Sequence, residues 1–129
     1  MQAAAAGTGV RLSDGSTNKL PVGDRDTVVA GWAEHHRLVR RSLAHGYYQG
    51  WDLHPAQLPT RYAATYAFYR EGLAGALDRL EAYAGRGSHG GIVDEPATAR
   101  ALARYVLRGL DCGAVDAGEA RGLDLRSFL

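Results

Sequence analysis

Only two stretches of this 129-residue sequence have the character of β-strands, and this shortage constrains its fold more than any other feature. The first covers residues 10–13, and the second covers residues 47–53, which are rich in aromatic side chains and end before Pro55. A helical pattern follows each stretch, and such strand–helix repeats build parallel sheets. Because parallel sheets normally contain several strands with both faces covered, two strands alone would leave both sheet edges open.

Three helices are predicted from the spacing of apolar residues. The first begins at Asp24 or Asp26, either of which can cap it, and ends near Gly46. The second covers residues 59–84 and the third begins at Pro96, a residue suited to the first turn of a helix. A short tail helix is also expected at residues 116–122.

The second helix holds the strongest pattern in the chain. Apolar residues recur every three or four positions from Tyr62 to Ala84. Gly72 and Gly75 interrupt this pattern, and each costs about 1 kcal/mol relative to Ala, so a break is expected there. An isolated chain would leave part of this apolar stripe, from Tyr62 to Leu80, exposed.

Composition excludes several classes of protein. Hydrophobic residues make up 46% of the chain and the formal charge is +1, which suits one soluble unit and offers no basic field for nucleic acid. Cys112 is the single cysteine, so no internal disulfide is expected and the reducing cytoplasm is favoured. Neither an export signal nor a membrane span is predicted.

Three features that look like functional motifs have simpler structural explanations. The histidines at 35, 36 and 45 lack the i, i+4 spacing of a helical metal site and are expected to be ordinary surface or boundary residues. Residues 85–90, GRGSHG, match the dinucleotide fingerprint, but a helix precedes them where the fingerprint needs a strand, so a hinge is expected. Cys112 has no activating base nearby in the sequence and is expected to be a buried small residue.

Polar residues follow the second predicted strand, at the edge where α/β folds bind ligands. Asp52 and His54 share one face of this extended segment, while Trp51 and Leu53 share the other. Asp52 and His54 could equally cap the next helix and bond each other, so the residues alone leave a site and a cap open.

Asp94 and Glu95 lie between the glycine-rich segment 85–91 and the start of the third helix. A helix N-terminus stabilises negative charge, so Asp94 could simply cap the helix. A mobile segment that carries an acid is also how a lid delivers a catalytic group. Both interpretations remain open at this stage.

Two of these segments resemble one family of carbon–carbon lyases, the citrate lyase beta-subunit and malyl-CoA lyase type. Residues 47–58, YYQGWDLHPAQL, resemble its last barrel strand, which ends in an I-H-P-A-Q-V-like motif. Residues 90–103, GGIVDEPATARALA, resemble its C-terminal lid, and residues 3–15 look like its seventh strand. The resemblance covers about residues 3–110 and suggests a divergent bacterial branch of the aldolase/citrate lyase family.

The resemblance implies an α/β fold in which this chain is the C-terminal portion of a (β/α)8 TIM barrel. Residues 1–84 would form the last two strand–helix units, and residues 85–129 would form a glycine-rich hinge and a helical lid. Strands from outside this sequence would then cover the open sheet edges.

The resemblance also implies an activity, namely Mg2+-dependent cleavage or condensation of an oxyacid or an acyl-CoA. The metal ligands would be a Glu and an Asp on earlier strands that this chain lacks, and Asp94 would be the catalytic acid/base, carried by the lid to a neighbouring subunit. We therefore expect a homo-oligomer whose subunits exchange lids. The chain would bind the remaining half of the barrel and would be inactive by itself. The alternative is a non-catalytic remnant or an assembly module that docks on a partner barrel. The candidate substrate-binding residues are Asp14, Asp52, His54, Pro55 and Gln57.

Overall fold

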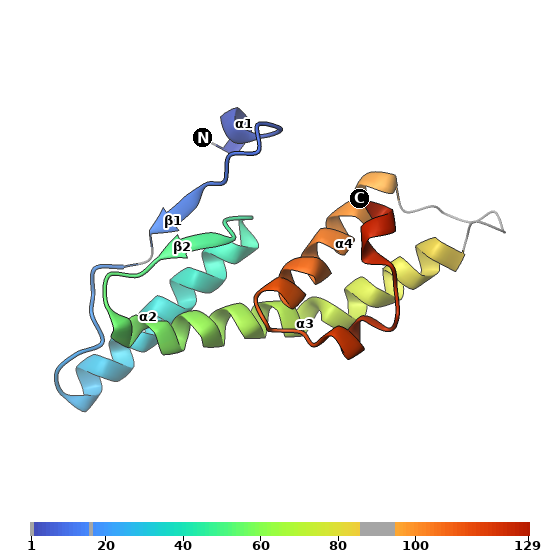
Figure 1. The fold of residues 1–129 in the computed structure, drawn as a ribbon. Coiled ribbons are helices and arrows are strands. Elements are labelled where there is room, and N and C mark those ends of the chain that lie inside the picture. Colours follow the sequence, from blue (N-terminus) through green and yellow to red (C-terminus); the bar gives the residue numbers. More distant parts are fainter. Residues whose placement is uncertain (1, 16, 86–94) are drawn as a thin grey trace. The chain divides into compact units, whose positions relative to one another are not determined.

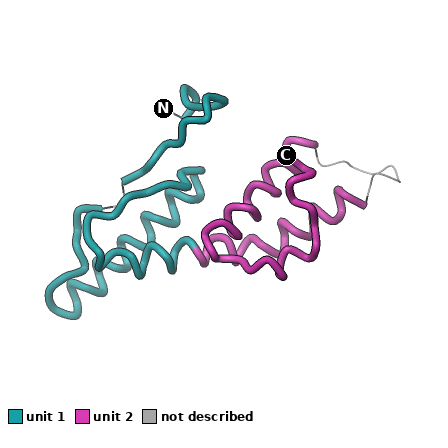
Figure 2. Tube along the Cα trace, in the orientation of Figure 1, with its two compact units in different colours: residues 1–65 teal, residues 66–129 magenta. Residues whose placement is uncertain are grey.

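The computed structural model of the chain describes residues 2–15, 17–85 and 95–129 (Figure 1). The chain divides into two compact units, unit 1 at residues 1–65 and unit 2 at residues 66–129 (Figure 2). The elements, in chain order, are α1 (Gln2–Ala5), β1 (Ser13–Gly15), α2 (Arg25–Ala44), β2 (Gln49–Trp51), the 3-10 helix η1 (Pro55–Gln57), α3 (Leu58–Gly85), α4 (Pro96–Asp111), and the 3-10 helices η3 (Ala117–Ala120) and η4 (Leu125–Phe128).

In unit 1, β1 and β2 pair in parallel, as the strand–helix–strand order predicts. Ser13 lies opposite Gln49, and Gly15 lies opposite Trp51. The first strand therefore begins three residues later than predicted. The physical reason is the register: it would place Val10 opposite Gly46, which has a φ of 81° and belongs to the turn after α2.

The first predicted helix is confirmed as α2. Asp24 caps it, because its side chain accepts a hydrogen bond of 2.8 Å from the Thr27 amide. The backbone amide of His45 closes the other end on the Arg41 carbonyl, and Gly46 follows with a positive φ. The residues of α2 that are buried are Gly31, His35, Val39 and Leu43, which recur every four positions.

The predicted break in the long helix is wrong, because α3 runs without interruption through Gly72 and Gly75. Gly72 is where Tyr105 of α4 approaches the helix closely. The Tyr105 hydroxyl donates to the carbonyls of Phe68 (2.6 Å) and Tyr69 (3.0 Å). This packing offsets the low helix propensity of glycine.

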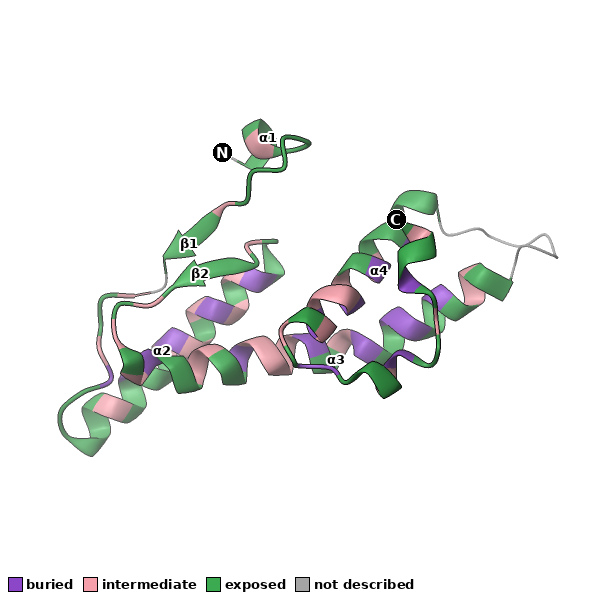
Figure 3. Cartoon of the chain, viewed as in Figure 1, coloured by how far each residue is buried: buried purple, intermediate pink, exposed green. Residues whose placement is uncertain are grey.

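Unit 2 buries the apolar stripe of α3 against α4 and the C-terminal tail. Leu80, Ala103 and Val106 are all fully buried, and Leu125 of η4 is nearly so. Figure 3 shows buried stretches in purple on both α3 and α4. The expectation that part of the stripe stays exposed is confirmed at Tyr62 in unit 1, which is 56% exposed, whereas the stripe is buried from Tyr69 to Leu80.

The predicted fold, the C-terminal portion of a (β/α)8 TIM barrel, is contradicted. Over the residues that the structure describes, the chain is 67% helical and holds two short parallel strands, so it is a mostly helical small domain. The physical reason is which elements bury the apolar surface of the helices. The helices of unit 2 pack on each other and not on a sheet, and every residue of β1 and β2 is exposed.

The predicted hinge lies largely outside the described residues, which omit 86–94. The third predicted helix is confirmed as α4, with Pro96 in its first turn and Glu95 before it. The expected tail helix is reduced to η3. Among the described helices, none has the length and apolar character needed to cross a membrane.

Candidate functional site

A buried polar network joins α2, the end of β2 and the start of α3. His35 is completely buried, and its Nδ1 lies 2.7 Å from Thr60 Oγ1. Its Nε2 lies 2.7 Å from Asp52 Oδ1. Arg61 donates to both oxygens of the same carboxylate, from Nε (3.0 Å) and from Nη2 (2.8 Å). This bidentate pairing is the strong, geometrically specific form of an ion pair.

The His35 ring links the start of α3 to Asp52. The Thr60 hydroxyl oxygen lies 2.7 Å from Nδ1 of this ring and 3.0 Å from the Gln57 carbonyl oxygen. An ionised Asp52 accepts a hydrogen bond from His35 Nε2. The Asp52 carboxylate therefore lies between the His35 ring and the Arg61 guanidinium.

The carboxyl group of Asp52 is only 10% exposed, and this burial by itself raises its pKa. The hydrogen bonds from Arg61 and His35 act in the opposite direction and win, so the pKa of Asp52 lies below its ordinary value. The charges of the same two residues add to that effect. Asp52 is therefore held as a carboxylate.

Gln57 is fully buried and organises the turn after β2. Its Oε1 accepts from the amides of Leu53 (2.9 Å) and His54 (3.2 Å), and its Nε2 donates to the Thr17 carbonyl (3.0 Å). His54 caps the same turn, because its Nδ1 accepts from the Ala56 amide at 3.1 Å. For His54 and Gln57, the structure thus favours the capping interpretation over a ligand site.

The other candidate residues are dispersed. Pro55 occupies the first turn of η1, beside His54. Asp14 lies in β1, opposite Gly50, and accepts a hydrogen bond of 2.5 Å from Ser42. Asp94 lies outside the described residues, so its catalytic role stays a prediction.

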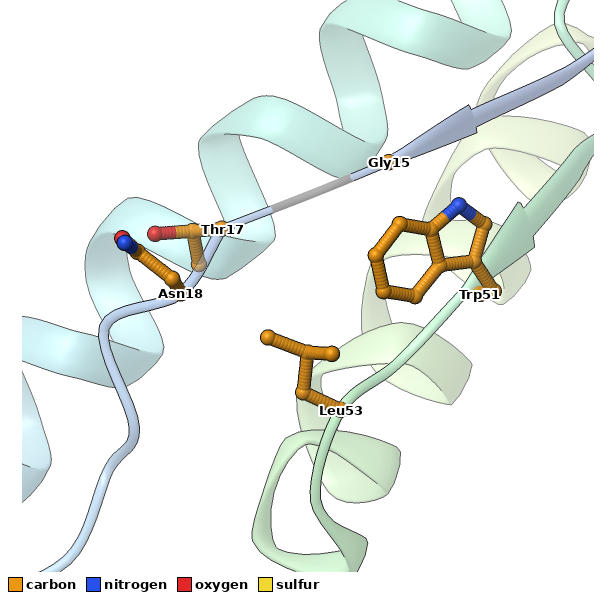
Figure 4. Close-up of a pocket in the computed structure, with 5 residues that line it drawn as sticks. All are labelled: Gly15, Thr17, Asn18, Trp51 and Leu53. Carbon is orange, nitrogen blue, oxygen red and sulfur yellow. The ribbon is translucent and has the colours of Figure 1, made fainter.

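The side chains of Trp51 and Leu53, which alternate with those of Asp52 and His54, form an exposed apolar face beside the strands. Trp51 and Leu53 are each 54% exposed. Together with Gly15, Thr17 and Asn18 they line a shallow hollow of about 220 Å3. Figure 4 shows the two apolar side chains pointing toward β1 and the segment that follows it.

The resemblance places the ligands of its Mg2+ on strands outside this chain, and the described residues provide no metal centre in their place. Within this part of the chain there is no group of three or more His, Cys, Asp or Glu side chains that could hold a metal ion. The acidic residues that the structure brings near the strands are Asp14 and Asp52, which accept hydrogen bonds from Ser42, His35 and Arg61. No chemical step is therefore assigned to a metal here.

Sequence reasoning missed three members of the buried network, which are His35, Thr60 and Arg61. The prediction that His35 is a surface or boundary residue is wrong, because its side chain is completely buried. One signal could have found His35: it occupies a position of the α2 stripe between Gly31 and Val39, where an apolar residue is expected. A polar side chain on such a stripe needs a buried partner. The identity of that partner depends on tertiary packing.

Comparison with known proteins finds one family that this chain matches. A family model described as a domain of unknown function, DUF6986, matches residues 1–128. No curated protein and no solved structure matches the chain.

Proposed function

The chain belongs to the DUF6986 family, and we propose that its unit 1 is an interaction module that completes its small sheet against a second copy of the chain. The observation that carries this proposal is the uncovered apolar face formed by Trp51 and Leu53 beside β1. Exposed apolar patches on folded proteins commonly mark such interfaces.

The distribution of exposed apolar side chains supports unit 1 as the docking part. Among the described residues, unit 2 contributes Leu129 to the exposed large hydrophobic side chains. All the others lie in unit 1: Val10, Val22, Val29, Trp32, Tyr48, Trp51, Leu53, Leu58 and Tyr62.

The sheet itself also supports the proposal. Within the described residues, β1 and β2 pair only with each other, and each has three residues. A two-stranded sheet is marginal by itself, and each open edge presents unpaired N–H and C=O groups. A second copy would supply both apolar cover and strand partners.

Sedimentation of the purified chain over a range of concentrations tests this proposal. We expect concentration-dependent association, which the double substitution Trp51→Ser and Leu53→Ser abolishes. The matched control is Leu129→Ser, which removes a comparably exposed apolar side chain from unit 2 and should leave association unchanged. A wild-type chain that stays monomeric at high concentration, or an equal effect of the control, would rule the proposal out.

We propose a second function from the motif resemblance, namely participation in a Mg2+-dependent carbon–carbon lyase that acts on an oxyacid or an acyl-CoA. The supporting observation is that His54 to Gln57 begin three residues after the end of β2, on the side of its carboxyl end. Ligands of α/β proteins bind at that end. In this proposal Asp94 is the acid/base, and the metal ligands come from residues other than those described.

We also propose the reducing cytoplasm as the compartment of this protein. The support is the cysteine content, since Cys112 is the single cysteine and is a free thiol.

A further inference from the structure

A second hollow in unit 1 lies between β1 and the last turns of α2, and it is polar and charged. It has a volume of about 350 Å3, within the range of small-molecule sites. The side chains that line it include Asp14, Leu38, Arg41, Ser42, His45 and Tyr47.

The two charged groups of this hollow come from different elements. Asp14 is in β1, and its Oδ2 accepts a hydrogen bond from Ser42, which orients the carboxylate. Among the described residues, Asp14 Oδ1 accepts no further hydrogen bond. Arg41 belongs to the last turn of α2, and in the same part of the chain its guanidinium forms no hydrogen bond or ion pair. One acceptor and one cation therefore remain for a ligand.

Besides Asp14, the His45 ring and the carboxyl end of α2 offer this hollow groups that attract a cation. His45 Nδ1 lies 2.7 Å from the Arg41 carbonyl and must donate to it, so Nε2 of a neutral ring is an acceptor. The carboxyl end of α2 carries the negative end of the helix dipole and favours a cation. A plain anion would meet this unfavourable field, whereas a ligand with both charges would satisfy both sides.

We propose that this hollow binds a small zwitterionic α-amino acid. Its ammonium group pairs with Asp14 near the end of α2, and its carboxylate pairs with the Arg41 guanidinium, which matches carboxylate geometry. The Tyr47 hydroxyl is a further donor in the same lining, and Leu38 offers contact to an apolar side chain. This inference uses neither the face of Trp51 and Leu53 nor Asp94, which carry the other two proposals, although Asp14 is also a candidate residue of the lyase proposal.

Titration calorimetry of the whole chain with L-valine, isovalerate and isobutylamine tests the inference, because the last two lack the ammonium and the carboxylate respectively. We expect valine to bind at least about tenfold more tightly than either analogue, since each lacks one charge-assisted hydrogen bond. Equal binding of isovalerate would reveal a simple anion site. That result, or no binding of valine, would overturn the proposal.

Two variants locate the site. Arg41→Gln and Asp14→Asn should each weaken valine binding by about tenfold or more. Asn at position 14 can still accept the hydrogen bond from Ser42, so folding is preserved, and circular dichroism checks this. The matched control is Arg37→Gln, an exposed cation of the same helix outside the lining. Unchanged binding in the Arg41 variant, or an equal loss in the control, would place valine elsewhere.

Discussion

At the scale of single residues, unit 1 depends on buried polar side chains as much as on apolar ones. Its largest fully buried side chains are His35, Gln57 and Val39, and two of these three are polar. No buried side-chain nitrogen or oxygen in the described residues lacks a hydrogen-bond partner. Such a network holds one arrangement strongly when complete, and removal of one member leaves the others buried without a partner.

Substitution of Asp52 by Asn tests the charge of this network. We expect the free energy of unfolding of unit 1 to fall by about 2–3 kcal/mol, because Arg61 and His35 lose their common carboxylate. Urea unfolding followed by tryptophan fluorescence measures this directly, since Trp32 and Trp51 are the two tryptophans and both lie in unit 1. The control Asp111→Asn, at an exposed carboxylate, should change stability by less than about 0.5 kcal/mol.

The same carboxylate makes the stability of unit 1 depend on pH. The folded pKa of Asp52 is lowered, so its contribution is complete above the ordinary Asp value of about 3.9 and is lost as pH falls through the folded value. The unfolding midpoint in urea should therefore drop more steeply below about pH 4 in the wild type than in the Asp52→Asn chain. Parallel curves for the two chains would contradict this role of Asp52.

Gln57 offers a test that involves no charge. The substitution Gln57→Leu nearly preserves volume but leaves the amides of Leu53 and His54 and the carbonyl of Thr17 without this partner. We expect a loss of about 2–4 kcal/mol in the same fluorescence measurement. Gln49→Leu at an exposed position of β2 is the control, and a similar loss there would show that Gln57 is not special.

At the scale of elements, the contact between α3 and α4 explains why a glycine lies inside a long helix. A Cβ at Gly72 would overlap the Tyr105 hydroxyl, whereas a Cβ at Gly75 would meet nothing within 4 Å. The same substitution at these two positions of α3 should therefore have opposite effects.

Gly75→Ala should raise the free energy of unfolding of unit 2 by about 1 kcal/mol, the gain in helix propensity. Gly72→Ala should lower it by about 1–3 kcal/mol, because the displaced Tyr105 loses its bonds to the carbonyls of Phe68 and Tyr69. Thermal unfolding followed by circular dichroism compares the two. Stabilisation by both substitutions would mean that Tyr105 moves aside without cost.

At the scale of the whole molecule, the two units differ in how completely they bury their apolar surface. Unit 2 contains the large apolar cluster built from α3, α4 and the tail. Unit 1 holds most of the exposed large hydrophobic side chains that are described. A search for partners should therefore begin with unit 1.

The lyase proposal makes a prediction for the isolated chain. We expect the 129-residue chain with Mg2+ to show no turnover of malyl-CoA or citramalyl-CoA, since the lyase proposal takes its metal ligands from strands outside this sequence. A coupled assay that detects the acetyl-CoA released by carbon–carbon cleavage checks this. Turnover by the chain alone that Asp94→Ala abolishes would show that a complete site, metal ligands included, forms from this sequence.

The positions of the three long helices could be predicted from the sequence because their signals are local. Apolar spacing, the Asp24 cap and Pro96 act within a few residues, so the predicted bounds of α2, α3 and α4 lie close to the observed ones. The strands were harder to place, because the bounds of β1 depend on its register with β2, which lies more than thirty residues away. The two parallel strands were predicted correctly, but the barrel predicted around them is wrong, because a motif resemblance carries no information on what the apolar helix faces cover.

For the candidate site, the residues by themselves identified Asp52 and His54 as important polar residues after β2 and left their roles open, and the family resemblance added Gln57. Only the tertiary structure decided that Asp52 binds His35 and Arg61, that His54 is a cap, and that Gln57 ties the turn to Thr17. The physical reason is range. A cap acts within one turn of backbone, whereas the partner of a buried charge is set by which helices pack together.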